Sequence, residues 1–162
     1  MAARSTREPE VREVMTVLAE TPGQIARITR GCTASAIRAR PEADAWSAYE
    51  ILAHLRVCAD VWGKSIHRML TEERPTIRYV SPRSRLKTTD YLELDFTASL
   101  QAFARQRAVL LDVLGGLDRT GWSRRATFTG TTLGRNGSVI TYAKRIADHE
   151  VKHLGQLRRT VT

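Results

Sequence analysis

Apolar residues recur at intervals of three and four along most of the chain, and runs that alternate between apolar and polar residues are nearly absent. This spacing places apolar side chains on one face of an α-helix, so we predict an all-α protein. The first helix is expected over about residues 8–30. Pro22 lies inside this stretch, and we expect a kink or a restart there, because proline cannot donate to the preceding turn.

The second predicted helix has the clearest start in the sequence. The Ser47 hydroxyl can accept from a free backbone N–H, and the Glu50 carboxylate can reach back to the Ser47 N–H, which together form a capping box. This helix is expected to continue to about Leu70. Its apolar stripe, beside which His54 lies, consists of Ile51, Leu55, Cys58 and Trp62.

A long connection over residues 71–88 contains two prolines and lacks helical periodicity. A third helix is predicted to begin at Asp90, with Glu93 three residues later, and to end at the glycine pair 115–116. A glycine-rich loop region follows, with an extended turn around residues 126–134, and the last helix is expected over about Ser138–Arg159. The predicted buried face of the third helix is Leu92, Phe96, Leu100, Phe103, Leu110 and Leu114.

Four long amphipathic helices, two of them joined by a long connection, are typical of a four-helix bundle with at least one crossover. A chain of 162 residues is one domain of ordinary size, and we predict a single domain over residues 1–162. No apolar run approaches the ~20 residues of a membrane span, and the N-terminal residues lack a secretory h-region. The two cysteines, Cys32 and Cys58, fit a reducing compartment as small buried residues, so we expect a cytoplasmic protein.

The net charge of +9 raises the question of nucleic-acid binding. The arginines are spread through every segment, and no zinc-finger, RNP or helix-turn-helix pattern accompanies them. We therefore expect no nucleic-acid partner. A positive mouth around a pocket would instead favour an anionic small molecule as substrate.

Three histidines fall on helix faces that are otherwise predicted to be core. His149 and His153 are four residues apart and share one helical face, and a bundle can bring His54 to them from another helix. Three neutral imidazoles would bind a divalent metal and leave a position open for water or substrate. The alternative is that each histidine packs in the core with its own polar partner. His67 is rotated away from His54 and is expected at the surface.

Residues 149–153 form a literal H-E-x-x-H, the pattern of zinc peptidase helices. A peptidase takes its third ligand from further down the chain, but the residues after His153 include no His, Asp, Glu or Cys. A classical peptidase is therefore not expected. Glu150 is the candidate catalytic residue, as a proton acceptor or a group behind the ligands; an ordinary role as a solvated helix charge or an ion-pair partner is equally open. Two further side chains, Tyr142 and Gln156, remain open between packing and site roles, whereas Trp46 and Trp62 are expected to belong to the core.

The stretch "WSAYEILAHLRVCADVW", followed by a long middle and "ADHEVKHLGQLRR", resembles the DinB/YfiT-like superfamily of metalloenzymes. The resemblance runs from about Val11 to Arg159. Its anchors are the Trp-Ser helix start, a histidine about seven residues later, and the H-[DE]-x-x-H-x-x-Q-L ending. It implies a four-helix bundle whose long crossover joins the second and third helices, a divalent metal, zinc or nickel, and frequent homodimers. The implied metal ligands are His54, His149 and His153.

Characterised members of that superfamily act as transferases or isomerases that depend on low-molecular-weight thiols such as mycothiol, bacillithiol or glutathione. The resemblance therefore implies a metal-dependent transferase or isomerase acting on a small substrate, with a thiol as a further cofactor. A metal-binding, stress-associated bundle without turnover is the alternative, and it requires the same ligands. In a third hypothesis a basic bundle binds nucleic acid and the histidines are incidental.

Overall fold

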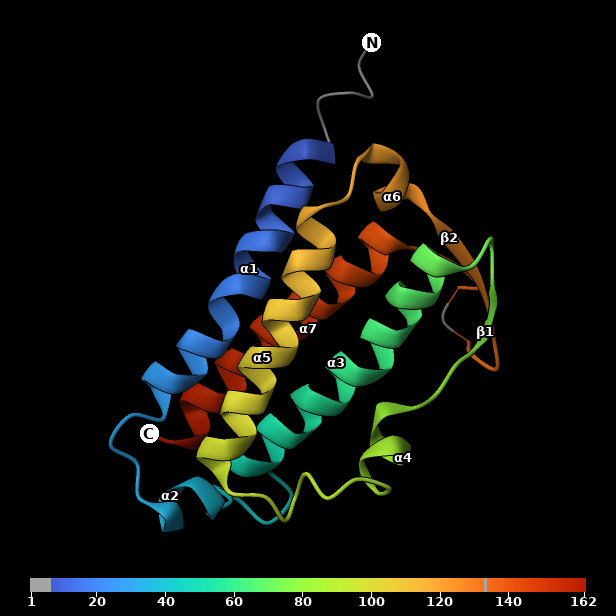
Figure 1. Ribbon diagram of the computed structural model, residues 1–162. Helices are drawn as coiled ribbons and strands as arrows, with labels where there is room; N and C mark the ends of the chain where they lie inside the picture. The colour runs from blue at the N-terminus through green and yellow to red at the C-terminus, as the bar shows by residue number, and fades with distance from the viewer. Residues whose placement is uncertain (1–6, 133) are drawn as a thin grey trace.

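Four long helices pack side by side in the computed structural model, which describes residues 7–132 and 134–162 (Figure 1). The four helices are α1 (Arg7–Ile28), α3 (Ala48–Thr71), α5 (Phe96–Gly115) and α7 (Val139–Thr160). Helices α1 and α3 each pack against both α5 and α7, so α1 lies diagonally opposite α3, and α5 lies diagonally opposite α7. Residues 1–6 of the predicted domain lie outside the described ranges.

The connection between α3 and α5 is the predicted crossover. These two helices run in the same direction, so the chain must return along the bundle before α5 begins (Figure 1). The return passes along the outer side of α3 and contains strand β1 (Thr76–Arg78) and helix α4 (Pro82–Leu86), which packs on α3. The four-helix bundle with a crossover between its second and third long helices is confirmed. Within the described ranges, no helix is both long and apolar enough to cross a membrane.

A small sheet at one end of the bundle was not predicted. Strand β1 pairs in parallel with β2 (Arg125–Thr129), which follows the short helix α6 (Arg119–Ser123) in the chain. Strand β2 also pairs antiparallel with β3 (Asn136–Ser138). Strands of three to five residues are too short to show a clear alternation in sequence. Only an extended turn was expected here, and Leu133 within it lies outside the described residues. The sheet fastens the crossover to the loop that precedes α7.

The start of α5 differs from the prediction. The Asp95 side chain caps the helix by accepting from the Ala98 N–H at 2.9 Å, so the helix begins at Phe96 and not at Asp90. Asp90 and Glu93 lie in turns before the helix, and Leu92 is exposed. Asp90 and Asp95 are both acidic residues that could cap this helix, and Asp95 directly precedes the apolar run that begins at Phe96. The capping box at the start of α3 is confirmed, since Ser47 and Glu50 bond reciprocally.

α1 continues through Pro22, so the helix does not restart there. Proline has no N–H, and the carbonyl of Leu18 therefore lacks the donor it would receive from a residue four positions later. The guanidinium of Arg107 in α5 donates to that carbonyl at 2.8 Å. A tertiary hydrogen bond thus replaces the missing helical one and allows the proline to stay within the helix.

The core consists of two apolar clusters, one toward each end of the bundle. Between them, three helices contribute a buried polar side chain: Thr21 from α1, Arg107 from α5 and Glu150 from α7. The short helix α2 (Ala34–Arg38) covers the end that holds the second cluster. The candidate site lies at this polar level, where α3 meets α7.

Candidate metal centre

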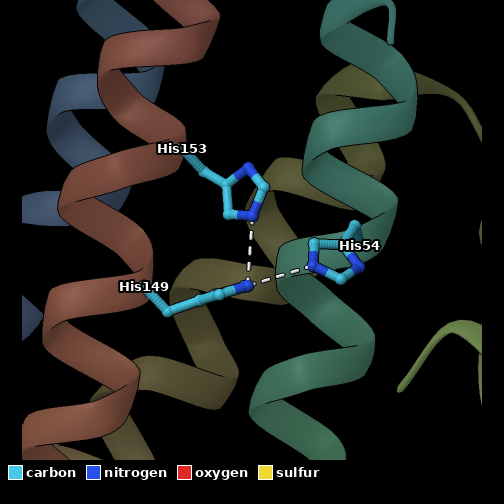
Figure 2. Close-up of side chains that lie close together, drawn as sticks. All are labelled: His54, His149 and His153. Atoms are coloured by element: carbon cyan, nitrogen blue, oxygen red, sulfur yellow. Dashed lines mark hydrogen bonds between the residues drawn. The ribbon is translucent and has the colours of Figure 1, made fainter. Parts of the chain in front are cut away.

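The structure brings the three predicted histidines together between α3 and α7 (Figure 2). The Nε2 atom of His149 lies 3.1 Å from Nε2 of His54 and 3.1 Å from Nε2 of His153. The three ligand atoms lie within 4.8 Å of one another. In a tetrahedral zinc site with Zn–N bonds of about 2.0–2.1 Å, ligand nitrogens are about 3.3 Å apart. The donor set and its spacing therefore fit one metal ion.

The imidazoles are held in the form that binds metals. Burial, with help from the neighbouring His153 and from Arg83, lowers the pKa of His54 to about 4. Burial, with help from the other two histidines, lowers the pKa of His149 to about 3. Burial also lowers the pKa of His153. All three rings are consequently neutral at pH 7, with a lone pair available on one nitrogen of each ring.

Gln156 fixes the orientation of His153. Its Oε1 lies 2.8 Å from Nδ1 of His153, so Nδ1 carries the proton and Nε2 presents its lone pair to the cluster. The sequence left this role open. The signal that pointed to it was the position of Gln156, one turn beyond His153 on the same helix.

Replacing Gln156 by leucine is expected to weaken zinc affinity about 10- to 100-fold, because the His153 ring loses the partner that sets its tautomer. Competition titration against a chromogenic chelator measures the change. Gln101→Leu, at an exposed position on α5, is the matched control and should leave the affinity unaltered. Equal affinities in the Gln156 variant and the wild type would contradict the assignment.

Two tryptophans enclose the cluster. The Trp46 ring stacks on His153 with 5.9 Å between centroids and lies 4.9 Å from His54. The Trp62 ring meets His149 edge-on at 4.9 Å. Trp62 is buried as predicted, whereas Trp46 is only half-buried. His149 is itself partly exposed, whereas His54 and His153 are buried.

Glu150 does not join the histidines. Its carboxylate accepts two hydrogen bonds from Arg107, one of them 2.8 Å long, and both side chains are almost completely buried. One residue of α-helix is a rotation of about 100°, so Glu150 points into the middle of the bundle while His149 points toward α3. Arg107 was not singled out from the sequence, although a charge in the otherwise apolar series of α5 was a visible signal.

Cys58 is the nearest thiol to the cluster. Its Sγ lies 3.5 Å from Nε2 of His54, one turn away on α3. Burial, with help from the negative charge of Glu150, raises the pKa of this thiol well above its usual range. Because the thiolate is the form that binds metals and attacks electrophiles, Cys58 remains a protonated packing residue, as predicted.

A positive charge lies near the cluster on the crossover side. The Arg83 guanidinium, from α4, is 5.4 Å from the centre of the Trp46 ring. Its charge contributes to the lowered pKa of both His54 and His153. His67, the histidine predicted at the surface, is exposed on α3.

The fold and the cluster define a four-helix-bundle protein with a three-histidine site able to hold a metal ion. A model of the DinB superfamily matches residues 18–157, and the chain belongs to that family. Among solved structures, the chain is similar to YfiT from Bacillus subtilis, described as "a probable metal-dependent hydrolase with an unusual four-helix bundle topology". The TM-score is 0.77 at 20% identity, over 93% of this chain and 85% of YfiT, so the likeness shows a shared fold. No curated protein matches the sequence significantly.

Proposed function

We propose that the protein is a metal-dependent enzyme that acts on a small molecule, with His54, His149 and His153 holding one divalent ion. The observation that supports this most directly is the 3.1 Å spacing of the Nε2 atoms in a cluster whose His149 is partly exposed. Imidazole ligands suit zinc and nickel, and three protein ligands leave a position free for a reactant. The description of YfiT as metal-dependent agrees with this proposal.

A divalent ion in this position supplies Lewis acidity, which lowers the pKa of a coordinated thiol or water. The chain's own residues supply the surroundings. Gln156 orients a ligand ring, and the tryptophan rings restrict the access of water. The positive charge of Arg83, near the cluster, would favour an anionic substrate.

The nucleophile in this proposal comes from outside the chain. Cys58 is buried within the bundle, and both carboxylate oxygens of Glu150 are occupied by Arg107. We therefore propose that Glu150 influences the reaction only by helping to position α7. Neither Cys58 nor Glu150 then serves as a general base beside the cluster. A low-molecular-weight thiol would need no such base, because a metal ion held by the three histidines would make a coordinated thiol acidic enough to lose its proton. We accordingly propose a thiol-dependent transferase or isomerase.

Cobalt-substituted protein tests this proposal. Adding 2-mercaptoethanol or glutathione is expected to produce a sulfur-to-cobalt charge-transfer band, whereas ethylene glycol, which lacks the sulfur, should not. His149→Ala protein treated in the same way is the control for cobalt bound elsewhere. Unaltered spectra with every thiol would overturn the thiol assignment and leave water, as in a hydrolase, or a site without turnover. The homodimer and the cytoplasmic location stay predictions.

A further inference from the structure

A cavity of about 540 Å³ lies beside the histidine cluster, between α3, the crossover segment and the small sheet. Its size falls in the range of about 300–1,000 Å³ that is usual for small-molecule sites. Trp62 belongs to both places, because its ring lines the cavity and touches His149. Helix α4 also serves both, since it places Arg83 near the cluster and Arg85 in the cavity wall.

One part of the cavity wall is aromatic. The rings of Phe128 and Tyr142 stack with their centroids 4.6 Å apart, and Trp62 lines the cavity with them. Gly137 makes room for this stack: a Cβ at that position would lie 2.5 Å from Cε2 of Tyr142 and 2.9 Å from Cε2 of Phe128. One face of Tyr142 is covered by Phe128 and the other by the Arg145 guanidinium, 4.6 Å from the ring centre, so the wall offers ring edges to an apolar group.

The other part of the wall is cationic. Lys64, Arg68, Arg78 and Arg85 line the cavity, and Asp60 is the one acid among the residues lining it. Asp60 is already engaged, since one of its oxygens accepts from the Tyr91 hydroxyl at 2.6 Å and the other from Gln106.

Among the four cations, only Arg68 forms an ion pair with a described residue, the exposed Glu72. Three positive groups thus face a cavity whose single carboxylate is occupied. Charge of one sign around a concave site raises the local concentration of ligands of the opposite sign.

We propose that this cavity binds an amphipathic organic anion, with its flat apolar body against Trp62, Phe128 and Tyr142. The anionic group lies against Lys64, Arg78 and Arg85. This inference rests on the proposed function and deepens it, because a molecule seated here is one indole ring away from the histidine cluster. It assigns the substrate class as an anion with an aromatic or similarly flat body, in preference to a small hydrophilic anion.

The probe for the test is 8-anilino-1-naphthalenesulfonate, a flat aromatic anion whose fluorescence rises in an apolar site. We expect one molecule to bind per chain. In the double variant Lys64→Gln/Arg85→Gln, the dissociation constant is expected to rise about 100-fold or more, since each of the two charge-assisted hydrogen bonds lost costs about tenfold or more. The matched control is Arg27→Gln/Arg30→Gln, which removes the same charge from exposed positions on and just after α1.

Equal affinities in the two double variants would overturn the inference, as would equal binding of the neutral analogue N-phenyl-1-naphthylamine. Circular dichroism verifies that both variants are folded, so that the probe does not report exposed core. Repeating the titration with metal-free His149→Ala protein separates this inference from the proposed function. If this variant still binds the probe, the cavity inference is supported independently of any metal. If wild-type protein that holds metal does not bind the probe, the cavity inference is wrong and the proposed function is unaffected.

Discussion

Wild-type protein purified without chelators is expected to carry close to one zinc or nickel ion per chain, and His54→Ala and His153→Ala are each expected to carry almost none. The two variants remove ligands from different helices, so their shared loss would require a site between α3 and α7. Either change leaves only two imidazole ligands, and a site with two such ligands exchanges its metal readily. Mass spectrometry of metal content on untagged protein gives the measurement.

The matched control for that experiment is His67→Ala, which removes an exposed histidine from the same helix as His54. Its metal content should equal that of the wild type. A second readout is thermal stability, because a ligand that binds only the folded state adds about 4 kcal/mol when present at 1,000 times its dissociation constant. Added zinc should therefore raise the Tm of the wild type and of His67→Ala only. If folded wild-type protein binds neither zinc nor nickel, the metal-site assignment is wrong and the three histidines are packing residues.

Arg107→Met is expected to destabilise the fold by about 3–5 kcal/mol, because it leaves the buried carboxylate of Glu150 without its partner. It also removes the donor to the Leu18 carbonyl, which Pro22 cannot replace. The double variant Arg107→Met/Glu150→Met should recover much of this loss, since apolar side chains of similar volume can substitute for a buried ion pair. Urea denaturation of the metal-free protein measures the free energies of unfolding.

The matched control is Arg68→Met, which removes an exposed ion pair. Arg68 lies in the last turn of α3, and its partner Glu72 is the residue that follows the helix. Exposed pairs of this kind contribute about 0–1 kcal/mol. If Arg107→Met cost no more than Arg68→Met, the buried pair would not be the structural element that we describe. If the double variant were less stable than Arg107→Met alone, the Glu150 side chain would have partners beyond Arg107.

The long helices and two of the three histidines, His149 and His153, were predictable because they follow from spacing along one helix. Residues four apart lie on the same face, so His149 and His153 had to converge wherever α7 packed. The placement of His54 on a core face and the family resemblance supplied the third residue. The Ser47 cap was equally local, since its partner lies three residues away.

What the sequence did not reveal depends on contacts between distant segments. The ion pair of Arg107 and Glu150 joins helices that face each other across the bundle, and a spacing rule within one helix carries no such information. The pairing of β1 with β2 likewise joins residues about 50 positions apart in the chain, such as Ile77 and Phe128. The H-E-x-x-H pattern suggested a base beside the ligands, yet a rotation of about 100° per residue directs Glu150 elsewhere.

The two helices that hold the cluster contribute residues 95 positions apart, His54 from α3 and His149 from α7. A growing chain therefore has no site until its C-terminal helix has been made and has packed against α3. Metal bound there, as we propose, would stabilise chains that have finished folding and would leave unfinished chains without that stabilisation. In a cell, the supply of metal would act as a checkpoint on maturation, so metal-starved chains would be the ones exposed to proteases.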